Sequence, residues 1–449
     1  MGRLFGTDGV RGIANTELTC ELAYGIGKAS ALVLAKDGRR RPVFLIGSDT
    51  RASSDMLDAA LTSGLCAVGA DVIRLGVIPT PAVAFLVGKY KADAGIMISA
   101  SHNPAEYNGI KLFSGDGYKL PDALEEEIEQ IVLDGETVFP APIGGDIGRV
   151  TVAENAAKDY IDHLKSTVLY APDGMRIAVD CANGAASVTA ERLFRELRTD
   201  VHLLHHTPNG ININRDCGST HLDSLAKYVV ENGLDLGIAF DGDADRCLCV
   251  DENGNEVDGD QIMAICAMDM KERGKLSGNT VVGTIMTNFG FSKFCKQNDL
   301  QFIATKVGDR YVLEELLLGE FSFGGEQSGH VIFRDFATTG DGQLTAIQLL
   351  SYLKRSGTKL SKLAAIMTKY PQLNINLTVS AEAKLQFYTN SAIKKAMASS
   401  KKALDGIGRI VVRPSGTEPL IRVMAEGDDP ALVKEQAEAV AAIIKEQLK

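Results

Sequence analysis

Three segments of the chain repeat one order of elements, and this repeat constrains the fold more than any other feature. Each segment opens with an apolar run of strand length, at 43–47, 177–180 and 281–284. A helical pattern follows, for example at 56–68 and 185–197. A second apolar strand closes each segment, at 94–98, 236–240 and 321–324. Apolar strands alternating with helical patterns predict α/β units with parallel strands, whose functional loops gather at the carboxyl ends of the strands.

The end of the chain has a different pattern. Residues 373–379 alternate between apolar and polar side chains, as a half-exposed strand does. Residues 409–413 and 420–426 are typical of two more strands, and an amphipathic helix begins near Pro430. This pattern predicts a small α+β unit after three related α/β units. We therefore expect four domains that pack into one body, at 1–150, 151–255, 256–368 and 369–449.

Composition excludes several classes of protein. The 449 residues are 45% hydrophobic and 23% charged, as is typical of a globular protein. The net charge of −11 argues against a nucleic-acid partner, which would need a basic face. No apolar run reaches the roughly 18 residues of a membrane span, and the start lacks a signal-peptide pattern. The eight cysteines form no C-x-x-C pair, so a reducing cytoplasm is the expected location.

An acidic loop follows the strand predicted at 236–240, with Asp241, Asp243 and Asp245 within five residues. Three carboxylates in one turn repel each other unless a cation lies among them, and oxygen ligands suit Mg²⁺. With Glu252, the spacing also resembles the ligand positions of a calcium-binding EF-hand. That interpretation fails because Arg246 replaces the required glycine and the flanking runs are strand-like. A phosphatase with an aspartate nucleophile, a magnesium site that serves another nucleophile and a solvated acidic turn all stay open.

A polar loop at 99–104 follows the strand predicted at 94–98, and it contains Ser101 and His102. A serine at a strand end is suited to nucleophilic attack, but it needs an activating partner. His102 is adjacent in sequence, which rarely gives the geometry of a catalytic triad. A simple turn cap made by serine and asparagine side chains therefore stays open.

The third unit carries a loop in which Glu326, Ser328 and His330 occupy alternate positions. On an extended segment these side chains would project to the same side. A carboxylate and a hydroxyl suit sugar hydroxyls, and a histidine can transfer protons, although a structural role for His330 stays open. The same unit has a second polar loop, with Lys306, Asp309 and Arg310.

The fourth unit has a turn between its predicted strands that contains Arg413, Ser415, Gly416 and Thr417. Small residues free backbone N–H groups to form an anion nest, and the hydroxyls and guanidinium add donors. This combination suits a phosphate, and a plain glycine turn is the alternative. A further glycine-rich loop at 5–12 contains Arg11.

Together, five motifs resemble the α-D-phosphohexomutase superfamily, in the order of that family, at 6–12, 99–104, 241–246, 325–330 and 413–419. The resemblance covers essentially the whole chain. Glutamine at position 327 resembles the glucosamine branch of this superfamily, since the other branches usually carry methionine at that position. Ser99 departs from the common threonine. The resemblance implies four domains around a central cleft, three mixed α/β and one C-terminal α+β.

The resemblance also implies the roles of the site residues. Ser101 would be carried as a phosphoserine, primed by a sugar 1,6-bisphosphate or by autophosphorylation. One Mg²⁺ per subunit would be held by Asp241, Asp243, Asp245 and an oxygen of phosphorylated Ser101. The catalytic groups would be Lys111 and His330 as acid and base, Arg11 and Arg246 on the transferring phosphoryl group, and His102. The substrate would be bound by Glu326, Ser328, Lys306, Asp309 and Arg310, and its distal phosphate by Arg413, Ser415, Gly416 and Thr417.

The implied activity is the reversible isomerisation of glucosamine 6-phosphate to glucosamine 1-phosphate through a 1,6-bisphosphate. This reaction feeds UDP-N-acetylglucosamine and cell-wall precursor synthesis. The resemblance implies a small phosphosugar substrate, a cytoplasmic location and a homodimer. The first alternative is a phosphomannomutase or phosphoglucomutase of the same superfamily. A phosphatase that uses Asp241 and an inactive phosphosugar-binding protein are the alternatives from other classes.

Overall fold

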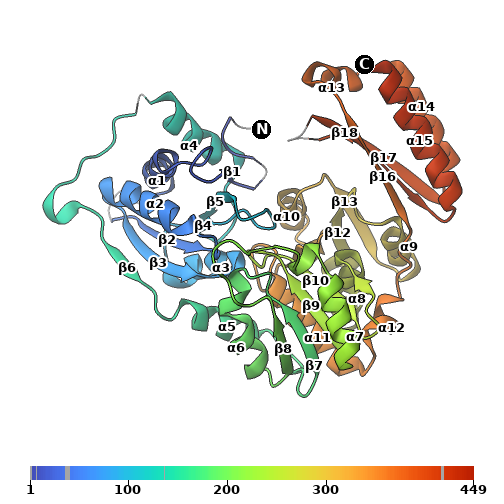
Figure 1. Cartoon of the computed structure of the whole chain (residues 1–449), viewed down its shortest axis with the longest axis horizontal. Coiled ribbons are helices and arrows are strands. Elements are labelled where there is room, and N and C mark those ends of the chain that lie inside the picture. Colours follow the sequence, from blue (N-terminus) through green and yellow to red (C-terminus); the bar gives the residue numbers. More distant parts are fainter. Residues whose placement is uncertain (1–2, 7, 36–40, 136, 416–418, 449) are drawn as a thin grey trace.

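The computed structural model describes residues 3–6, 8–35, 41–135, 137–415 and 419–448. Within them the chain forms four β-sheets, of six, five, four and three strands, and each sheet is built from one continuous part of the chain. We call the units around these sheets the first to fourth domains. Figure 1 shows the first domain on the left, the second and third below and beside it, and the fourth at the upper right.

The first sheet has the strand order β1-β5-β4-β2-β3-β6. Strand β2 is parallel to β3 and β4, whereas β5 is antiparallel to β4 and β1. Helices α1, α2 and α4 pack on one face, and α3 packs on the other. The bounds are β1 Val10–Ile13, α1 Cys20–Leu34, β2 Val43–Ser48, α2 Ser54–Ala67, β3 Asp71–Val77, α3 Thr80–Tyr90, β4 Ala94–Ile98, β5 Tyr107–Ser114, α4 Asp122–Asp134 and β6 Val150–Val152.

The second sheet has the order β11-β10-β9-β7-β8, with β7 parallel to β8 and β9 and with β10 antiparallel to β9. The helix expected at 185–197 is divided, because Thr189 has non-helical angles between a 3₁₀ turn at Ala185–Val188 and α6. The bounds are α5 Ala156–Ser166, β7 Arg176–Asp180, α6 Ala190–Glu196, β8 Asp200–Leu204, α7 Asp223–Asn232, β9 Leu236–Phe240, β10 Cys247–Asp251 and β11 Glu256–Val257.

The third sheet has the order β13-β12-β14-β15, and its first three strands are parallel. Its core is continuous with that of the second domain, since α11 contacts both β10 and β15. The strand expected at 321–324 lies slightly later. The bounds are α8 Gly259–Glu272, β12 Thr280–Thr284, α9 Phe289–Gln297, β13 Gln301–Thr305, α10 Asp309–Leu318, β14 Phe323–Gly325, β15 Val331–Phe333, α11 Gly342–Ser356 and α12 Leu360–Ala364.

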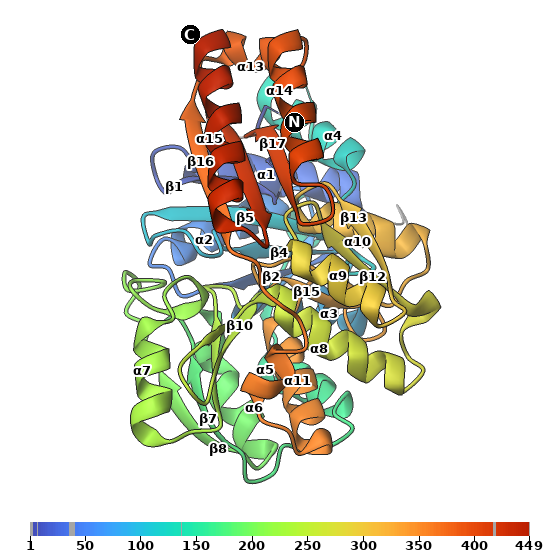
Figure 2. The same ribbon diagram turned by 90° about the vertical axis from the view of Figure 1, so that its right-hand side faces the viewer.

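The fourth sheet is antiparallel in the order β16-β18-β17, and α14 and α15 pack against it. Figure 2 shows this domain at the top of the molecule, above the other three. The three predicted strands and the following helix are confirmed. The bounds are β16 Gln372–Thr378, α13 Ala381–Phe387, α14 Ser391–Ala403, β17 Gly408–Pro414, β18 Leu420–Gly427 and α15 Pro430–Gln447.

The structure confirms the predicted α/β class, with three related domains and a C-terminal α+β domain. The closing strand of each repeat is β4, β9 or β14, and each leads directly into one of the predicted polar loops. The sheets therefore direct three loops that are distant in sequence toward one place. In the described part of the chain, no helix combines the length and apolarity that a membrane crossing requires.

Candidate active site

Ser101 lies just beyond the end of β4 and is 1% exposed. Its hydroxyl Oγ donates a 2.6 Å hydrogen bond to Oδ2 of Asp241. Its backbone has a φ of 53°, a left-handed conformation that costs energy for a residue with a side chain. Arg51 and Asn214 hold the Ser101 carbonyl oxygen from two sides, at 3.0 and 2.9 Å. These contacts fix the strained turn and direct the hydroxyl toward the acidic loop.

The acidic loop is the connection of the β9–β10 hairpin, and Asp241, Asp243 and Asp245 are all buried in it. Each offers a carboxylate oxygen, and these oxygens lie within 4.8 Å of one another. Among the described residues, Oδ1 of Asp243 and Oδ1 of Asp245 are buried without a hydrogen-bond partner. Buried oxygens without donors fit a hard cation as the missing partner. The three carboxylates therefore suit Mg²⁺, as the sequence predicted.

The carboxylates of this loop differ in their electrostatic surroundings. Burial, and then the charges of Asp245 and Asp243, raise the pKa of Asp241 well above its usual value. Burial acts in the same direction on Asp245, but Lys111 and His330 outweigh it and lower the pKa of Asp245. Asp241 is thus the carboxylate with the least support from cationic side chains. A divalent ion or a cationic ligand would supply that support.

The EF-hand interpretation is excluded by the local structure. The flanking segments are strands, and Glu252 lies beyond β10. Its two carboxylate oxygens accept hydrogen bonds from the hydroxyl and the backbone N–H of Ser361, at 2.6 and 3.2 Å. Glu252 therefore caps the chain near α12 and is separate from the aspartate loop.

Lys111 on β5 enters the acidic loop from the first domain, and its side chain is 2% exposed. Its Nζ lies 2.7 Å from Asp243, 3.0 Å from Asp8 and 3.6 Å from Asp245. Burial lowers the pKa of Lys111, but these carboxylates outweigh it and raise the pKa above its ordinary value. Lys111 is therefore an ammonium group in this arrangement, and it can donate but not accept a proton.

Two residues of this network were missed by the sequence reasoning, Asp8 and Lys119. Asp8 accepts from Arg11, Lys111 and Lys119, and Lys119 also binds Asp309 of the third domain. Burial raises the pKa of Asp8, but Lys111 and Lys119 outweigh it and hold the pKa well below its usual range. Asp8 lies within the glycine-rich motif at 6–12, which was a usable signal, whereas nothing in the local sequence marked Lys119.

His330 is buried between two carboxylates. Its Nδ1 lies 3.5 Å from Asp245, and its Nε2 lies 3.5 Å from Asp309. The backbone N–H of Gly340 also donates to Nε2 at 3.0 Å. Burial lowers the pKa of His330, but Asp245 and Asp309 outweigh it, so the pKa is raised. Both ring nitrogens are therefore engaged, with the proton of the neutral tautomer directed toward Asp245.

The segment that precedes His330 differs from the expected extended form. Residues 326–329 form the turn between β14 and β15, with Gly329 at a φ of 91°. Glu326 is half-buried, and its Oε1 accepts from the backbone N–H of Gly308 at 3.1 Å. Ser328 is half-buried in the same turn. The alternate positions of Glu326, Ser328 and His330 therefore do not imply a common side, because a hairpin turn, unlike a strand, does not align alternate side chains.

The predicted loop at 306–310 is only partly directed at the aspartates. Lys306 is exposed and lies over the ring of Tyr311, 5.4 Å from its centroid. Asp309 is held by Lys119. Arg310 forms ion pairs with the acidic side chains of Asp122, Glu125 and Glu314. The Arg310 guanidinium therefore connects α10 to α4 in this conformation.

Arg246 and His102 flank the acidic loop. Arg246 is half-buried, and its Nε has no hydrogen-bond partner among the described residues. The Asp241 and Asp245 carboxylates outweigh burial and raise the pKa of Arg246. His102 has its Nδ1 3.4 Å from Oγ of Ser101. Burial, and then Arg246 and Arg11, lower the pKa of His102 to about 4, so this ring is neutral near pH 7.

The predicted phosphate turn belongs to the fourth domain. Arg413 is half-buried at the end of β17, and burial, followed by the charge of Arg422, lowers its pKa. Ser415 is buried, and its carbonyl oxygen accepts from Nζ of Lys384 at 2.9 Å. The other two predicted residues, Gly416 and Thr417, lie outside the described residues. Figure 1 shows the β17–β18 hairpin directed toward the first domain.

Two further features lie outside this site. Asp180, His205 and Cys217 form a second compact cluster, but the Asp180 carboxylate already accepts from the backbone N–H groups of Ala182 and Gly218 and from His205. The Asp180 carboxylate therefore has its hydrogen-bond donors within the protein, and the cluster holds its loop in place.

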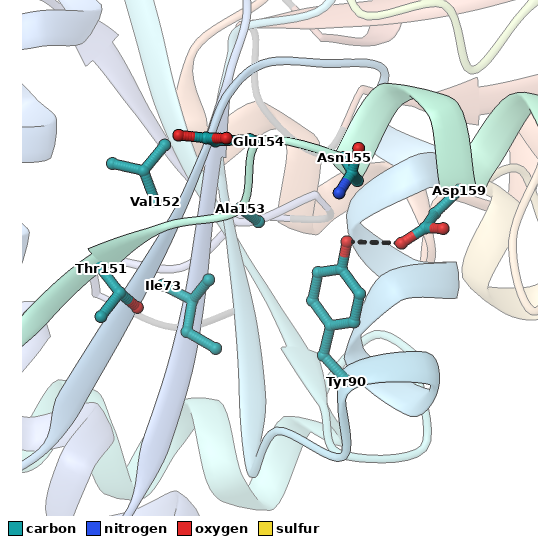
Figure 3. Close-up of a pocket in the computed structure, with 8 residues that line it drawn as sticks. All are labelled: Ile73, Tyr90, Thr151, Val152, Ala153, Glu154, Asn155 and Asp159. Carbon is teal, nitrogen blue, oxygen red and sulfur yellow. Dashed lines mark hydrogen bonds between the residues drawn. The ribbon is translucent and has the colours of Figure 1, made fainter.

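Figure 3 shows a shallow pocket where β3, β6 and α5 meet, in which the Tyr90 hydroxyl donates to Asp159 at 2.8 Å. None of the predicted site residues lines this pocket.

Comparison with known proteins agrees with this geometry over the whole chain. The family described as "Phosphoglucomutase/phosphomannomutase, alpha/beta/alpha domain" I, II and III matches residues 2–138, 158–254 and 258–370, and its C-terminal domain matches 375–443. A phosphoglucosamine mutase of Ruminiclostridium cellulolyticum is 53% identical over 448 residues, with 100% of both chains covered. The chain belongs to the phosphoglucosamine mutase family. A second member, from Thermoanaerobacter sp., is 54% identical with the same coverage.

Solved structures share the fold at much lower identity. A phosphoglucomutase/phosphomannomutase family protein of Burkholderia thailandensis has a TM-score of 0.84 and 22% identity, covering 99% of this chain and 97% of the other. The N-acetylphosphoglucosamine mutase of Aspergillus fumigatus, solved with GlcNAc-6P and magnesium, has a TM-score of 0.71 and 16% identity, with coverage of 100% and 96%. These likenesses confirm the predicted fold.

Proposed function

We propose that this protein interconverts glucosamine 6-phosphate and glucosamine 1-phosphate, through a phosphoserine at Ser101 and a 1,6-bisphosphate intermediate. One observation carries the proposal: the hydroxyl of Ser101 lies against the buried carboxylates of a metal-type loop 140 residues away. Membership of the phosphoglucosamine mutase family supports the choice of substrate. The activity would supply an amino-sugar phosphate for nucleotide-sugar and cell-wall precursor synthesis.

The phosphoryl group would move twice between Ser101 and the sugar. In the first step the P–O bond at Ser101 breaks as the free sugar hydroxyl forms a new one; the hydroxyl proton passes to a base, and the released Ser101 oxygen takes a proton from an acid. In the second step Oγ of Ser101 loses its proton and attacks the other phosphoryl group, whose P–O bond to the sugar breaks, and the sugar oxygen takes up a proton. Mg²⁺, held by Asp241, Asp243, Asp245 and a phosphoserine oxygen, would neutralise charge on the transferring group. Phosphoryl transfer depends mainly on positioning and electrostatics, which buried cations supply.

The chain's own residues take the remaining roles. Arg11 and Arg246 would contact the equatorial oxygens of the transferring phosphoryl group. Lys111 is protonated here, which favours the acid role for it and leaves the base role to His330. The neutral ring of His102 would line the phosphoserine loop without adding a charge.

Residues of the third and fourth domains would bind the substrate. Its hydroxyls and amino group would meet a polar wall formed by Glu326, Ser328, Lys306, Asp309 and Arg310. The phosphate that is not reacting would bind Arg413, Ser415, Gly416 and Thr417. Because one distal site must accept either end of the sugar, the bisphosphate would turn within the cleft between the two transfers.

We also propose the domain boundaries near residues 150, 255 and 368, a homodimer and a cytoplasmic location. All eight cysteines are free thiols, which supports a reducing compartment. Ser101 would be primed by a sugar 1,6-bisphosphate or by autophosphorylation.

A coupled assay that compares glucosamine, mannose and glucose phosphates tests the proposed substrate. We expect kcat/KM for glucosamine phosphate to exceed the others by at least about tenfold. A preference for mannose phosphate would overturn the substrate assignment and favour a phosphomannomutase.

Intact-mass analysis with peptide mapping tests the mechanism. One phosphoryl group on Ser101 is the expected result, and an aspartyl phosphate on Asp241 would instead indicate a phosphatase.

A further inference from the structure

Six ionisable side chains form a closed ring at the meeting point of the first three domains. In order around the ring they are Asp245, Lys111, Asp8, Lys119, Asp309 and His330. Each contacts the next, and the last returns to the first. The first domain supplies Asp8 and both lysines, the second supplies Asp245, and the third supplies Asp309 and His330. Acidic and basic members alternate, so each anion lies between two basic groups.

Lys119 is the member of this ring that joins the first domain to the third. Its ammonium group binds both Asp8 and Asp309, and its side chain is only 12% exposed. Burial lowers the pKa of Lys119, but Asp309 and Asp8 outweigh it and keep the group charged. Lys119 lies outside the five sequence motifs, and the proposed mechanism assigns it no role.

The segment that carries Lys119 is docked on the third domain at several further points. We call residues 117–125 the arm. The hydroxyl of Thr338 donates to the carbonyl oxygen of Gly117 at 2.6 Å, and Tyr118 packs against a small core of the third domain. At the other end of the arm, Asp122 and Glu125 pair with Arg310. The arm therefore holds the beginning of α10 through ion pairs to its first two residues, Asp309 and Arg310.

The beginning of α10 in turn holds the groups that face the sugar site. Asp309 is its first residue, and its carboxylate lies 3.5 Å from Nε2 of His330. The preceding residue, Gly308, donates its backbone N–H to Oε1 of Glu326. A displacement of Asp309 would therefore move both His330 and Glu326 relative to Ser101.

We propose that Lys119 is a positioning residue, which holds Asp309 and through it His330 and Glu326 in register with the phosphoserine loop of the first domain. Without its charge, the Asp8 and Asp309 carboxylates would face each other across the domain boundary with no cation between them. Their repulsion in a largely buried setting would push the two domains apart at this point. The turn proposed to bind the distal phosphate lies on the fourth domain, so its contribution to substrate binding would be retained.

Lys119→Met tests this inference, which rests on the proposed mutase activity. The methionine preserves the aliphatic stem and removes the charge. We expect kcat to fall at least about tenfold while KM changes by no more than about threefold. Lys119→Arg, which restores the charge, should recover kcat to within about threefold of the wild type. If Lys119→Met does not fold, Lys119→Gln takes its place in the same comparison.

Lys89→Met is the matched control, because Lys89 of the first domain pairs with Asp159 of the second domain at 3.0 Å, outside the ring. It should keep kcat within about twofold of the wild type. Equal losses in the two methionine variants, or a kcat for Lys119→Met within about twofold of the wild type, would overturn the inference. Absence of turnover in the wild type would instead contradict the proposed function itself.

Discussion

The hydroxyl of Ser101 donates a 2.6 Å hydrogen bond to the carboxylate of Asp241, although 140 residues separate the two in the chain. The contact joins the loop after β4 in the first domain to the loop after β9 in the second. Each loop alone has an ordinary explanation as a turn. Their contact gives the nucleophile a neighbouring cation site, and this pairing is what a phosphoryl-transfer centre requires.

Ser101→Ala should abolish turnover, with a loss of at least about 10³-fold in kcat, because no other hydroxyl occupies the nucleophile position. The purified variant should carry no phosphoryl group by intact-mass measurement, while Mg²⁺ binding persists through the three aspartates. Ser166→Ala, at an exposed position on α5, is the control and should be fully active. Substantial turnover in the Ser101 variant would exclude this residue as the phosphoryl carrier.

Asp243→Asn should weaken Mg²⁺ binding at least about tenfold, since it removes a charged ligand from a set of three. Isothermal titration of the metal-free protein measures the affinity. Glu252→Gln separates the magnesium site from the EF-hand interpretation. Because Glu252 bonds to Ser361, its variant should bind Mg²⁺ like the wild type. Equal losses of affinity in both variants would mean that the ligand set is wrongly assigned.

Gly340→Ala should lower kcat about tenfold or more, because its new Cβ would lie 2.4 to 2.6 Å from ring atoms of His330. The ring would have to move from its place between Asp245 and Asp309. Gly88→Ala is the control, since a Cβ there meets nothing within 4 Å. As a substitution within α3, it should leave kcat unchanged and stabilise the protein slightly. Unchanged kinetics in Gly340→Ala would argue against a fixed orientation of His330.

Asp341→Asn tests the pH dependence of stability. Burial raises the pKa of Asp341 to about 7, although the backbone N–H of Leu344 and the hydroxyl of Tyr160 favour its charged form. The folded protein thus holds a proton there more tightly than the unfolded chain does. Between about pH 4 and 7 this group should reduce the free energy of unfolding as pH rises, by at most about 1.4 kcal/mol per pH unit.

The asparagine variant cannot ionise, so it should gain stability relative to the wild type as pH rises through this window. Urea unfolding at several pH values measures the difference. The exposed Asp335→Asn serves as the comparison, and its difference from the wild type should stay flat. A flat difference for Asp341→Asn as well would show that Asp341 keeps an ordinary pKa.

Glu426→Gln should lower the stability of the fourth domain. The carboxylate of Glu426 is fully buried on β18 and accepts from the backbone N–H of Phe289 in α9, from Arg409 and from Gln372, at 2.8, 2.6 and 2.7 Å. Replacing a charged acceptor with an amide should cost about 2 kcal/mol in the free energy of unfolding and speed hydrogen exchange in the fourth domain. Glu435→Gln, exposed on α15, should change neither quantity.

Local pattern was enough to predict the order of strands and helices, because buried strands and amphipathic helices depend on side-chain periodicity within a short window. The helix at 185–197 was an exception, since the angles at Thr189 divide it. The motifs also marked Ser101, Lys111, the three aspartates and His330. Ser101, the three aspartates and His330 lie in loops that follow the ends of strands, where α/β sheets place their functional loops, whereas Lys111 lies within β5.

Only the tertiary structure decided how those residues are arranged. It buried His330 between two carboxylates and turned Arg310 toward α4. It also brought Lys119 to Asp309, 190 residues later. The sequence determined which chemical groups are present and on which loops, because that information is local. The pairing of charges across domains depends on how separate sheets pack, and no single stretch of sequence encodes it.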